Sequence, residues 1–362
     1  MTMRPLDGVT LLETSSAACP LALRLAISMA GRIAADLGAD VVKVEAGDGD
    51  PVRRIPPFVG GIGALFAFLN AGKRSIAVSS SDLRILPRLI ATADAVVLDD
   101  GLYRQQTVAC DAQVAAVLSM FSPCVPPGIP ASEFTVMALG GLLDLIGDPQ
   151  RQPLRMGGHQ AAYAAGLAAY TGIAAALCRN VDGRVPPEVI EISLLDTVIW
   201  LNWKSAAIAV LGRPVPRRSG RVSAWPVVRC LDGWIAVVYA DTDWPALRDL
   251  IDNPRLADPC FATREGRGRH ADELSGIVER AFGHLSRRAI QALAVERRLP
   301  LGPVLSPQEL TTDPQVVARG FLHRVPLSDE IAAMPRLPVL WGGQSFPPGQ
   351  VPMPVVAPGA VG

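Results

Sequence analysis

Short apolar runs alternate with longer helical stretches along the first third of the chain. The apolar runs are rich in β-branched and aliphatic residues, which favours buried strands, and they fall at 9–12, 39–45, 75–78, 95–98 and 114–120. Helical patterns lie between some of them, at 21–37, 65–70 and 83–93, and Gly38 is suited to cap the first helix. This alternation predicts an α/β fold with a parallel sheet covered on both faces. Ligands of such sheets bind outside the carboxyl ends of the strands.

The pattern changes after residue 130. Helical stretches are expected at 132–146 and 160–178, followed by a strand at 189–193 and by helix through Val210. The segment 214–220 (PVPRRSG) is typical of a linker. Residues 229–237 predict a hairpin around an Asp-Gly pair, and two or three helices are expected between 243 and 298. The chain is long enough for two domains.

The charge balance argues against polyanionic partners. Lys and Arg number 34, as do Asp and Glu, so the net charge is zero and we expect no nucleic-acid partner. Hydrophobic residues make up 49% and charged residues 19%, which indicates a well-buried protein or a large oligomer interface. The N-terminal MTMRPLDG lacks the apolar core of a signal peptide, and Arg24 and Arg32 interrupt the apolar segment 21–35. We therefore expect no membrane partner and a cytoplasmic location.

Cysteine spacing and short motifs add little chemistry. The six cysteines lie far apart without a Cys-x-x-Cys pair, so we expect reduced thiols and no metal site. Cys124 is one candidate nucleophile, although a lone thiol without a base partner is usually inert. We find no convincing catalytic triad, zinc-protease, P-loop or dinucleotide-binding motif.

Two segments resemble a known family. Residues 31–80 (GRIAADLGADVVKVEAGDGDPVRR … ALFAFLNAGKRSIAVSS) are similar to the start of the class III coenzyme A transferases, the CaiB/BaiF type. Residues 153–177 (PLRMGGHQAAYAAGLAAYTGIAAAL) resemble the catalytic segment of that family. The motifs DGW at 232–234, LPLGPVLSPQEL at 299–310 and DPQVVARG at 313–320 extend the resemblance. Their common order is more specific than any one motif.

The resemblance implies an architecture that composition could not show. It implies a Rossmann-like large domain at 1–213, a small α+β domain at 214–300, and a return segment at 301–362 that completes the large domain. It also implies two interlocked subunits, either a homodimer or a heterodimer with a homologous subunit. The implied substrates are coenzyme A, bound as an acyl-CoA, and a carboxylic acid, without a metal.

The resemblance assigns contacts with coenzyme A to six positions: Ser16, Ala17, Arg53, Asn70, Lys73 and Arg74. In the family the lysine of the Asn-x-x-Lys-Arg-Ser stretch lies near the phosphates, which cations neutralise by charge-assisted hydrogen bonds. The alternatives are two solvated cations at Lys73 and Arg74 and a loop salt bridge at Arg53. The loop at Ser16 and Ala17 matches the one that touches the pantetheine arm.

Two departures from the family affect this site. The position after Glu45 is often arginine in the family and is Ala46 here. The Asn-Phe-Arg-Pro-Gly type of loop is replaced by Asp99-Asp100-Gly101-Leu102-Tyr103. Two carboxylates at that loop are expected to repel a phosphate.

A third departure removes the family's nucleophile, because Ala162 stands where the family has an aspartate. That aspartate attacks the thioester, and the mixed anhydride becomes an enzyme-bound thioester before the acceptor is loaded. We consider His159 as a stand-in, since the positive end of the expected helix favours a neutral imidazole. Glu133 and Asp144 are candidate carboxylates on the preceding helical stretch. Each of the three has an ordinary alternative as a capping or solvated side chain.

Three functions follow from these observations. The first is CoA transfer by direct attack of the acceptor carboxylate in a ternary complex, since positioning alone can lower a barrier by ~7 kcal/mol. The second is a CoA-ester isomerase or racemase that uses His159 with Glu133 or Asp144. The third is a non-catalytic subunit that pairs with an active homologue.

Overall fold

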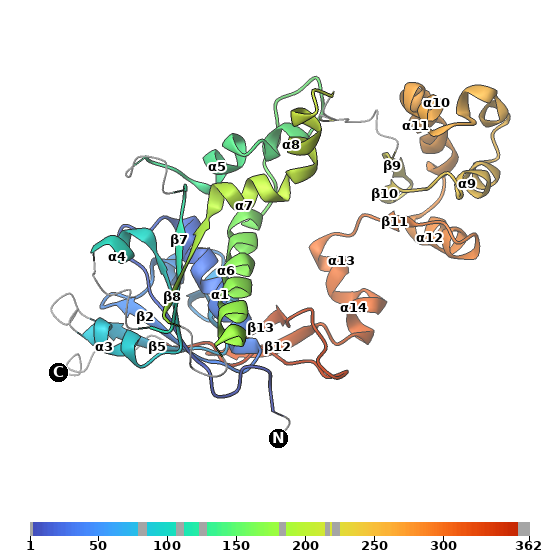
Figure 1. Ribbon diagram of the computed structural model, residues 1–362. Helices are drawn as coiled ribbons and strands as arrows, with labels where there is room; N and C mark the ends of the chain where they lie inside the picture. The colour runs from blue at the N-terminus through green and yellow to red at the C-terminus, as the bar shows by residue number, and fades with distance from the viewer. Residues whose placement is uncertain are drawn as a thin grey trace. The chain divides into compact units, whose positions relative to one another are not determined.

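The computed structural model describes residues 3–78, 85–105, 112–122, 129–180, 186–213, 218 and 225–353. The chain divides into two compact units (Figure 1). Unit 1 comprises Met1–Leu143, Arg155–Arg213 and Pro314–Gly362, and unit 2 comprises Asp144–Leu154 and Pro214–Asp313. Cys124 and all but one residue of the expected linker at 214–220 lie outside the described residues.

A parallel sheet of six strands forms the centre of unit 1 in the described part of the chain. The strands run in the spatial order β5 (Arg74–Val78), β2 (Asp40–Ala46), β1 (Thr10–Glu13), β6 (Ala95–Asp99), β7 (Val114–Ser119) and β8 (Glu188–Ser193). Each neighbouring pair is parallel, and Leu11 of β1 lies opposite both Val41 and Ala95. This is the Rossmann-like strand order, which reverses direction between β1 and β6. The six expected strands of this sheet are confirmed to within one residue at each end.

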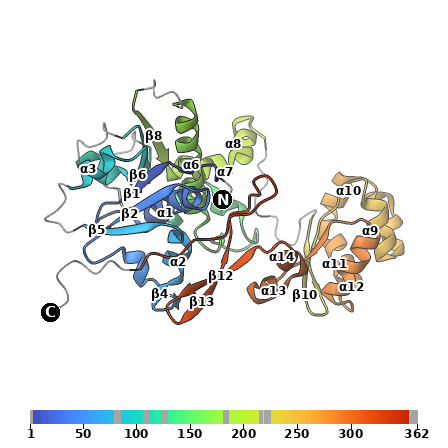
Figure 2. The ribbon, with the colours of Figure 1, turned by 90° about the horizontal axis from the view of Figure 1, so that it is seen from below.

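Helices cover both faces of the sheet. Successive side chains of a strand point to opposite faces, and here both faces are apolar. Leu11 and Val97 belong to the core beneath α1 (Leu21–Asp36) and α6 (Gln160–Arg179). Their neighbours Leu12 and Val96 belong to a separate core with α3 (Ile85–Ala91) and α4 (Asp100–Gln105). Figure 2 shows α3 on one side of these strands and α1 with α6 on the other.

The remaining elements of unit 1 are shorter. They are η1 (Pro51–Arg54), β3 (Phe58–Val59), β4 (Ile62–Gly63), α2 (Ala64–Asn70), α5 (Glu133–Leu139), α7 (Leu194–Leu201), α8 (Trp203–Val210), α14 (Pro314–Ala318), β12 (Leu322–Leu327) and β13 (Glu330–Pro335). The continuous helix expected at 132–146 is wrong. Gly141 adopts a left-handed φ of 75°, so α5 stops before it and the 3-10 helix η2 (Leu142–Leu145) follows.

Helix α6 is long and apolar enough to cross a membrane by length and composition alone. In this structure it packs along α1 in the core of unit 1. A β-carbon at Gly166 would lie 2.5 Å from the Ala26 carbonyl oxygen and 2.7 Å from the Met29 Cβ, so glycine is needed for this close approach. The packing is that of a central core helix.

Unit 2 is a small α+β unit with the antiparallel strand order β11 (Leu301–Pro303), β10 (Gly233–Val237) and β9 (Val227–Cys230). Cys230 pairs with Gly233, which confirms the expected hairpin. The helices are η3 (Pro254–Ala257), η4 (Pro259–Phe261), α9 (Trp244–Ile251), α10 (Arg264–Arg269), α11 (Ala271–Phe282), α12 (Arg287–Glu296) and α13 (Pro307–Thr312). The expected two or three helices between 243 and 298 are therefore wrong, because four α-helices fill this fully described stretch. Side-chain caps at Asn253, Asp258 and Thr263 begin new turns at short intervals.

Candidate functional site

The loop after β1 meets the end of β6 at the point where the strand order reverses. The Ser16 backbone N–H donates to Asp99 Oδ1 at 2.6 Å, and the Ser16 hydroxyl donates to Oδ2 at 2.7 Å. Asp99 is only 2% exposed. Doubly wound sheets bind ligands at this crevice. Asp99 therefore fixes the loop that borders the crevice, which the sequence argument about phosphate repulsion did not anticipate.

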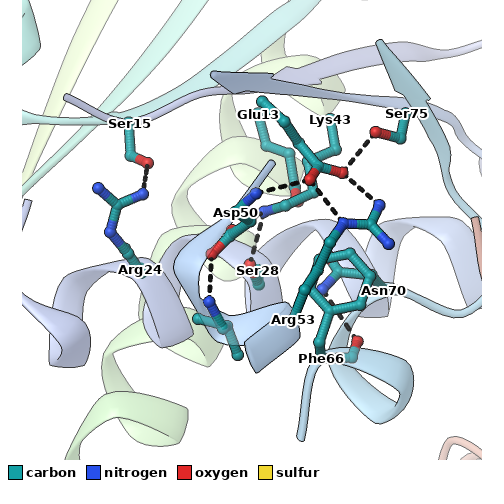
Figure 3. Close-up of polar contacts among 12 residues, drawn as sticks. Glu13, Ser15, Arg24, Ser28, Lys43, Asp50, Arg53, Phe66, Asn70 and Ser75 are labelled. Carbon is teal, nitrogen blue, oxygen red and sulfur yellow. Dashed lines mark hydrogen bonds and ion pairs between the residues drawn. The ribbon is translucent and has the colours of Figure 1, made fainter. Parts of the chain in front are cut away.

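Arg24, near the start of α1, holds the same loop from the other side. Its guanidinium donates to Ser15 Oγ at 2.8 Å (Figure 3). It also donates to the carbonyl oxygens of Ser16 at 2.6 Å and Ala17 at 3.1 Å. Ser16 is buried, whereas Ala17 is exposed. Ser16 and Ala17 are both predicted to contact the ligand, and of the two only Ala17 is exposed to solvent. Contact of either residue with a pantetheine arm stays a prediction.

A cavity of about 300 Å³ lies at the carboxyl ends of β7 and β8, beside α4. Its lining residues are Asp100, Tyr103, Arg104, Val117, Ser119, Phe121 and Glu191. Burial raises the pKa of Asp100 against the opposing Arg104 guanidinium, which lies 3.6 Å away, and Asp99 adds to the rise. When Asp100 and Glu191 are both ionised, the lining carries two carboxylates and one guanidinium, so it is poorly suited to a phosphate.

Charged side chains of β1 and β2 meet Asp50 in the interior of unit 1 (Figure 3). Glu13 Oε1 lies 3.0 Å from Lys43 Nζ, and Glu13 Oε2 lies 2.7 Å from Lys73 Nζ. Lys43 also contacts Asp50 Oδ2 at 2.8 Å. Burial alone would lower the pKa of Lys43, but its two carboxylate partners raise it. We call Glu13, Lys43, Asp50 and Lys73 the buried ion cluster; it balances two ammonium groups with two carboxylates.

Lys73 has no exposed side-chain surface. Besides Glu13, its ammonium donates to the Ser28 carbonyl at 2.8 Å and to Asn70 Oδ1 at 3.0 Å, which accounts for its three N–H groups. Burial lowers the pKa of Lys73 to about 8, against the single carboxylate of Glu13. A ligand would have to displace a protein acceptor to reach this lysine. The alternative of a solvated cation at Lys73 is wrong.

Arg53 forms a salt bridge with Glu45, the alternative to a contact with coenzyme A. It donates to Glu45 at 2.7 and 2.5 Å, and its guanidinium lies 3.9 Å from the centre of the Phe66 ring. Glu45 also accepts from the Ser75 hydroxyl at 2.5 Å. Burial alone would raise the pKa of Glu45, but the hydrogen bonds from Arg53 and Ser75 lower it. Arg53 is thus held inside unit 1.

Arg74 differs from the buried cations in both position and exposure. Its side chain is 64% exposed and pairs with Asp40 at 2.6 Å. Arg74 begins β5 and Asp40 begins β2. The amino ends of parallel strands lie at the edge opposite the usual ligand site. The structure therefore gives Arg53, Lys73 and Arg74 protein carboxylates as partners, and their contact with coenzyme A stays a prediction.

The structure brings His159 and Glu133 together at the start of α6, as the sequence analysis considered. Glu133 Oε2 lies 2.8 Å from His159 Nδ1. Glu133 Oε1 accepts the backbone N–H groups of Ala161 at 3.0 Å and Ala162 at 3.1 Å. Helix α6 begins at Gln160, as expected, and Glu133 satisfies two of its free N–H groups. A carboxylate is therefore present beside residue 162, although the Ala162 side chain is a buried methyl group.

Asp144 is not part of this pair. It belongs to unit 2, where its Oδ1 accepts from Arg218 at 2.9 Å. Within the described residues, no group of three or more His, Cys, Asp and Glu side chains is arranged to hold a metal ion.

Fold and site together define a two-unit α/β protein with a Rossmann-like sheet and a polar pair at the start of its central helix. The family described as CoA-transferase family III matches residues 6–100 and 127–356, so the chain belongs to this family, as the motifs predicted.

Named relatives agree with this assignment. The chain is 30% identical to a succinate–glutarate CoA-transferase of Agrobacterium fabrum, over 90% of this chain and 86% of that protein. It is 29% identical to a formyl-CoA:oxalate CoA-transferase of Streptomyces avermitilis, over 82% and 81%. The crystal structure of a CAIB/BAIF family protein from Brucella suis has the same fold, with a TM-score of 0.83 at 24% identity, over 98% of this chain and 97% of that one.

Sequence reasoning missed Glu13 as the partner of Lys73, and it missed the contacts of Lys43 with Glu13 and Asp50. A signal was available, because Lys43 interrupts an apolar strand and Glu13 ends another. A charge inside a buried strand needs an opposite charge nearby.

Proposed function

We propose that this protein transfers coenzyme A between an acyl-CoA thioester and a carboxylic acid without forming an anhydride on the enzyme. Family membership supports the reaction class. The observation that carries the proposal is the start of α6, where residue 162 has no nucleophile but Glu133 and His159 remain paired at 2.8 Å. A site that had lost all chemistry would have no need to keep this hydrogen-bonded pair.

The acceptor itself then has to act as the nucleophile. Its carboxylate attacks the thioester carbon, the C–S bond breaks, and CoA thiolate leaves a mixed anhydride of the two acids. The thiolate then attacks the acceptor carbonyl of this anhydride and expels the donor acid. In this proposal His159, in its protonated form, donates Nε2–H to the thiolate between the two attacks.

We also propose a dimer in the cytoplasm. Exposed apolar side chains on α7 and α8 support a subunit contact, because Trp200 is 73% exposed, Trp203 65% and Val210 87%. The partner is a second copy or a homologous subunit.

A second candidate function is the non-catalytic subunit. It is favoured by Ala162 and by the internal pairing of Lys73 and Arg53, two side chains expected to contact coenzyme A. In that case an active homologue supplies the chemistry. An isomerase or racemase is a third candidate, favoured by the Glu133–His159 pair, which is suited to proton transfer.

One experiment separates these functions. Pure protein is incubated in heavy water with succinyl-CoA and glutarate, or with formyl-CoA and oxalate, the substrates in the names of its relatives. A new CoA ester in the mass spectrum supports transfer. Deuterium at the α-carbon of an unchanged succinyl-CoA supports the isomerase. Neither product, together with a homologous subunit that co-purifies from the native host, supports the non-catalytic role.

The variant Ala162→Asp is the matched comparison. If the surrounding site is intact, this variant restores the family's nucleophile, and a protein-bound thioester accumulates from succinyl-CoA alone. The natural chain is expected to form none.

A further inference from the structure

The pair formed by Glu133 and His159 resembles the acid–base half of a hydrolytic triad. Transfer to a carboxylic acid needs no base, because the acceptor is already ionised at neutral pH. In its neutral form His159 therefore offers a base that the transfer reaction does not require.

The geometry fixes which nitrogen of His159 can act as the base. The Glu133 carboxylate accepts hydrogen bonds only, so Nδ1, at 2.8 Å, carries the proton and Nε2 carries the lone pair when the ring is neutral. Two backbone N–H groups hold the other carboxylate oxygen, so the carboxylate cannot rotate freely. No contact of Nε2 is recorded within the part of the chain that the structure describes.

Burial distinguishes the two members of the pair. The Glu133 side chain is 8% exposed, whereas the His159 side chain is 26% exposed. The imidazole lies edge-on to Tyr163, with ring centres 6.4 Å apart. A buried, fixed carboxylate behind a partly open imidazole is the arrangement that orients a general base toward a water molecule.

We propose that this site hydrolyses acyl-CoA thioesters, with His159 as the general base and Glu133 as its positioning residue. The proposal rests on the proposed function only in that CoA esters bind at the start of α6. Nε2 takes a proton from water while the water oxygen bonds to the thioester carbon. The C–S bond then breaks, and the imidazolium returns the proton to the leaving thiolate. Water and acyl-CoA become a free acid and CoA thiol, with no change in oxidation state.

The side chain at residue 162 explains why water can compete. A carboxylate there would capture the acyl group before water reached it, but Ala162 offers only a methyl group. When no acceptor acid is bound, water is the remaining nucleophile.

The test measures CoA release from acetyl-CoA and succinyl-CoA without any acceptor acid, in water labelled with oxygen-18. We expect thiol release above the buffer rate and one labelled oxygen in the released acid. His159→Gln is expected to lower this rate by roughly 100-fold or more, the usual contribution of a general base. The control His284→Gln changes an exposed histidine of unit 2 and leaves the rate unchanged.

A second variant guards against a merely structural effect. His159→Ala should recover part of the rate when free imidazole is added, which a folding defect would not do. Release at the buffer rate by the natural protein, or an undiminished rate in His159→Gln, overturns the proposal. If a new CoA ester forms with glutarate while no ester is hydrolysed, hydrolysis is refuted and transfer stands. If esters are hydrolysed but no new CoA ester forms, transfer is refuted and hydrolysis stands.

Discussion

Replacing Glu13 with glutamine tests whether Lys73 is a structural cation. The substitution keeps the shape of the side chain and removes the carboxylate that lies 2.7 Å from Lys73 Nζ, the one carboxylate that contacts this ammonium among the described residues. It also leaves Lys43 with Asp50 alone. The buried ion cluster would then hold two ammonium groups and one carboxylate.

The structure sets the size of the effect. Glu13 and Lys73 have no exposed side-chain surface and Lys43 has 6%, so solvent cannot replace the lost charge. Removing one partner of a buried pair costs about 3–5 kcal/mol of unfolding free energy. The cost stays in this range because Lys73, whose pKa is already about 8, can release its proton when the Glu13 carboxylate is replaced by a neutral amide. The variant should therefore also lose a proton from Lys73 near neutral pH.

Urea unfolding followed by circular dichroism measures this cost. With an m value of about 3 kcal/mol/M, the midpoint for unit 1 should fall by roughly 1–1.7 M. Asp40→Asn is the matched control, because its pair with Arg74 is 51% and 64% exposed and should be worth less than about 1 kcal/mol. A midpoint shift in Glu13→Gln no larger than that of the control would refute the structural role of Lys73.

Three further predictions concern packing, pH and thiol reactivity. Gly166→Ala should lower the free energy of unfolding by about 1–3 kcal/mol, because its β-carbon would meet a carbonyl oxygen of α1 at 2.5 Å. No atom lies within 4 Å of the β-carbon position at Gly268, so Gly268→Ala should raise the free energy of unfolding by up to about 1 kcal/mol. Equal effects of the two substitutions would contradict this reasoning. Burial raises the pKa of Asp36 from 3.8 to about 6, so between these pH values the folded state binds a proton that the unfolded state has released. The free energy of unfolding, measured relative to Asp36→Asn, should therefore fall by ~3 kcal/mol as the pH rises from 3.8 to about 6. Parallel pH-stability curves for the two proteins would argue against it. Burial also raises the pKa of the Cys19 thiol, so peptide mapping after iodoacetamide at pH 8 should find exposed Cys178 alkylated and Cys19 unmodified in the native protein.

The sheet of unit 1 could be predicted from the sequence because each strand is a separate apolar run. The runs at 95–98 and 114–120 correspond closely to β6 and β7. The breaks in helices were harder to predict. Gly141 ends α5 through its left-handed backbone, although the apolar pattern around it continues. Periodicity does not register a single residue of that kind.

The candidate site could be predicted only in part. The sequence indicated His159 with either Glu133 or Asp144. It could not choose between the two carboxylates, because the contact of His159 with Glu133 spans 26 residues and depends on the packing of α5 against α6. Lys73 shows a different limit. A buried ion pair and a phosphate contact both require a cation, so the sequence cannot distinguish them, whereas the position of Glu13 can.

Transfer without an enzyme-bound anhydride is the central claim, and a single-turnover oxygen-transfer experiment tests it most directly. Excess protein is mixed with succinyl-CoA and glutarate whose carboxylates carry oxygen-18. Direct attack passes one acceptor oxygen to the donor, so the account predicts labelled succinate in the first turnover. In the family's route the first released acid takes its oxygen from the enzyme. Unlabelled succinate, formed together with glutaryl-CoA, would contradict the account.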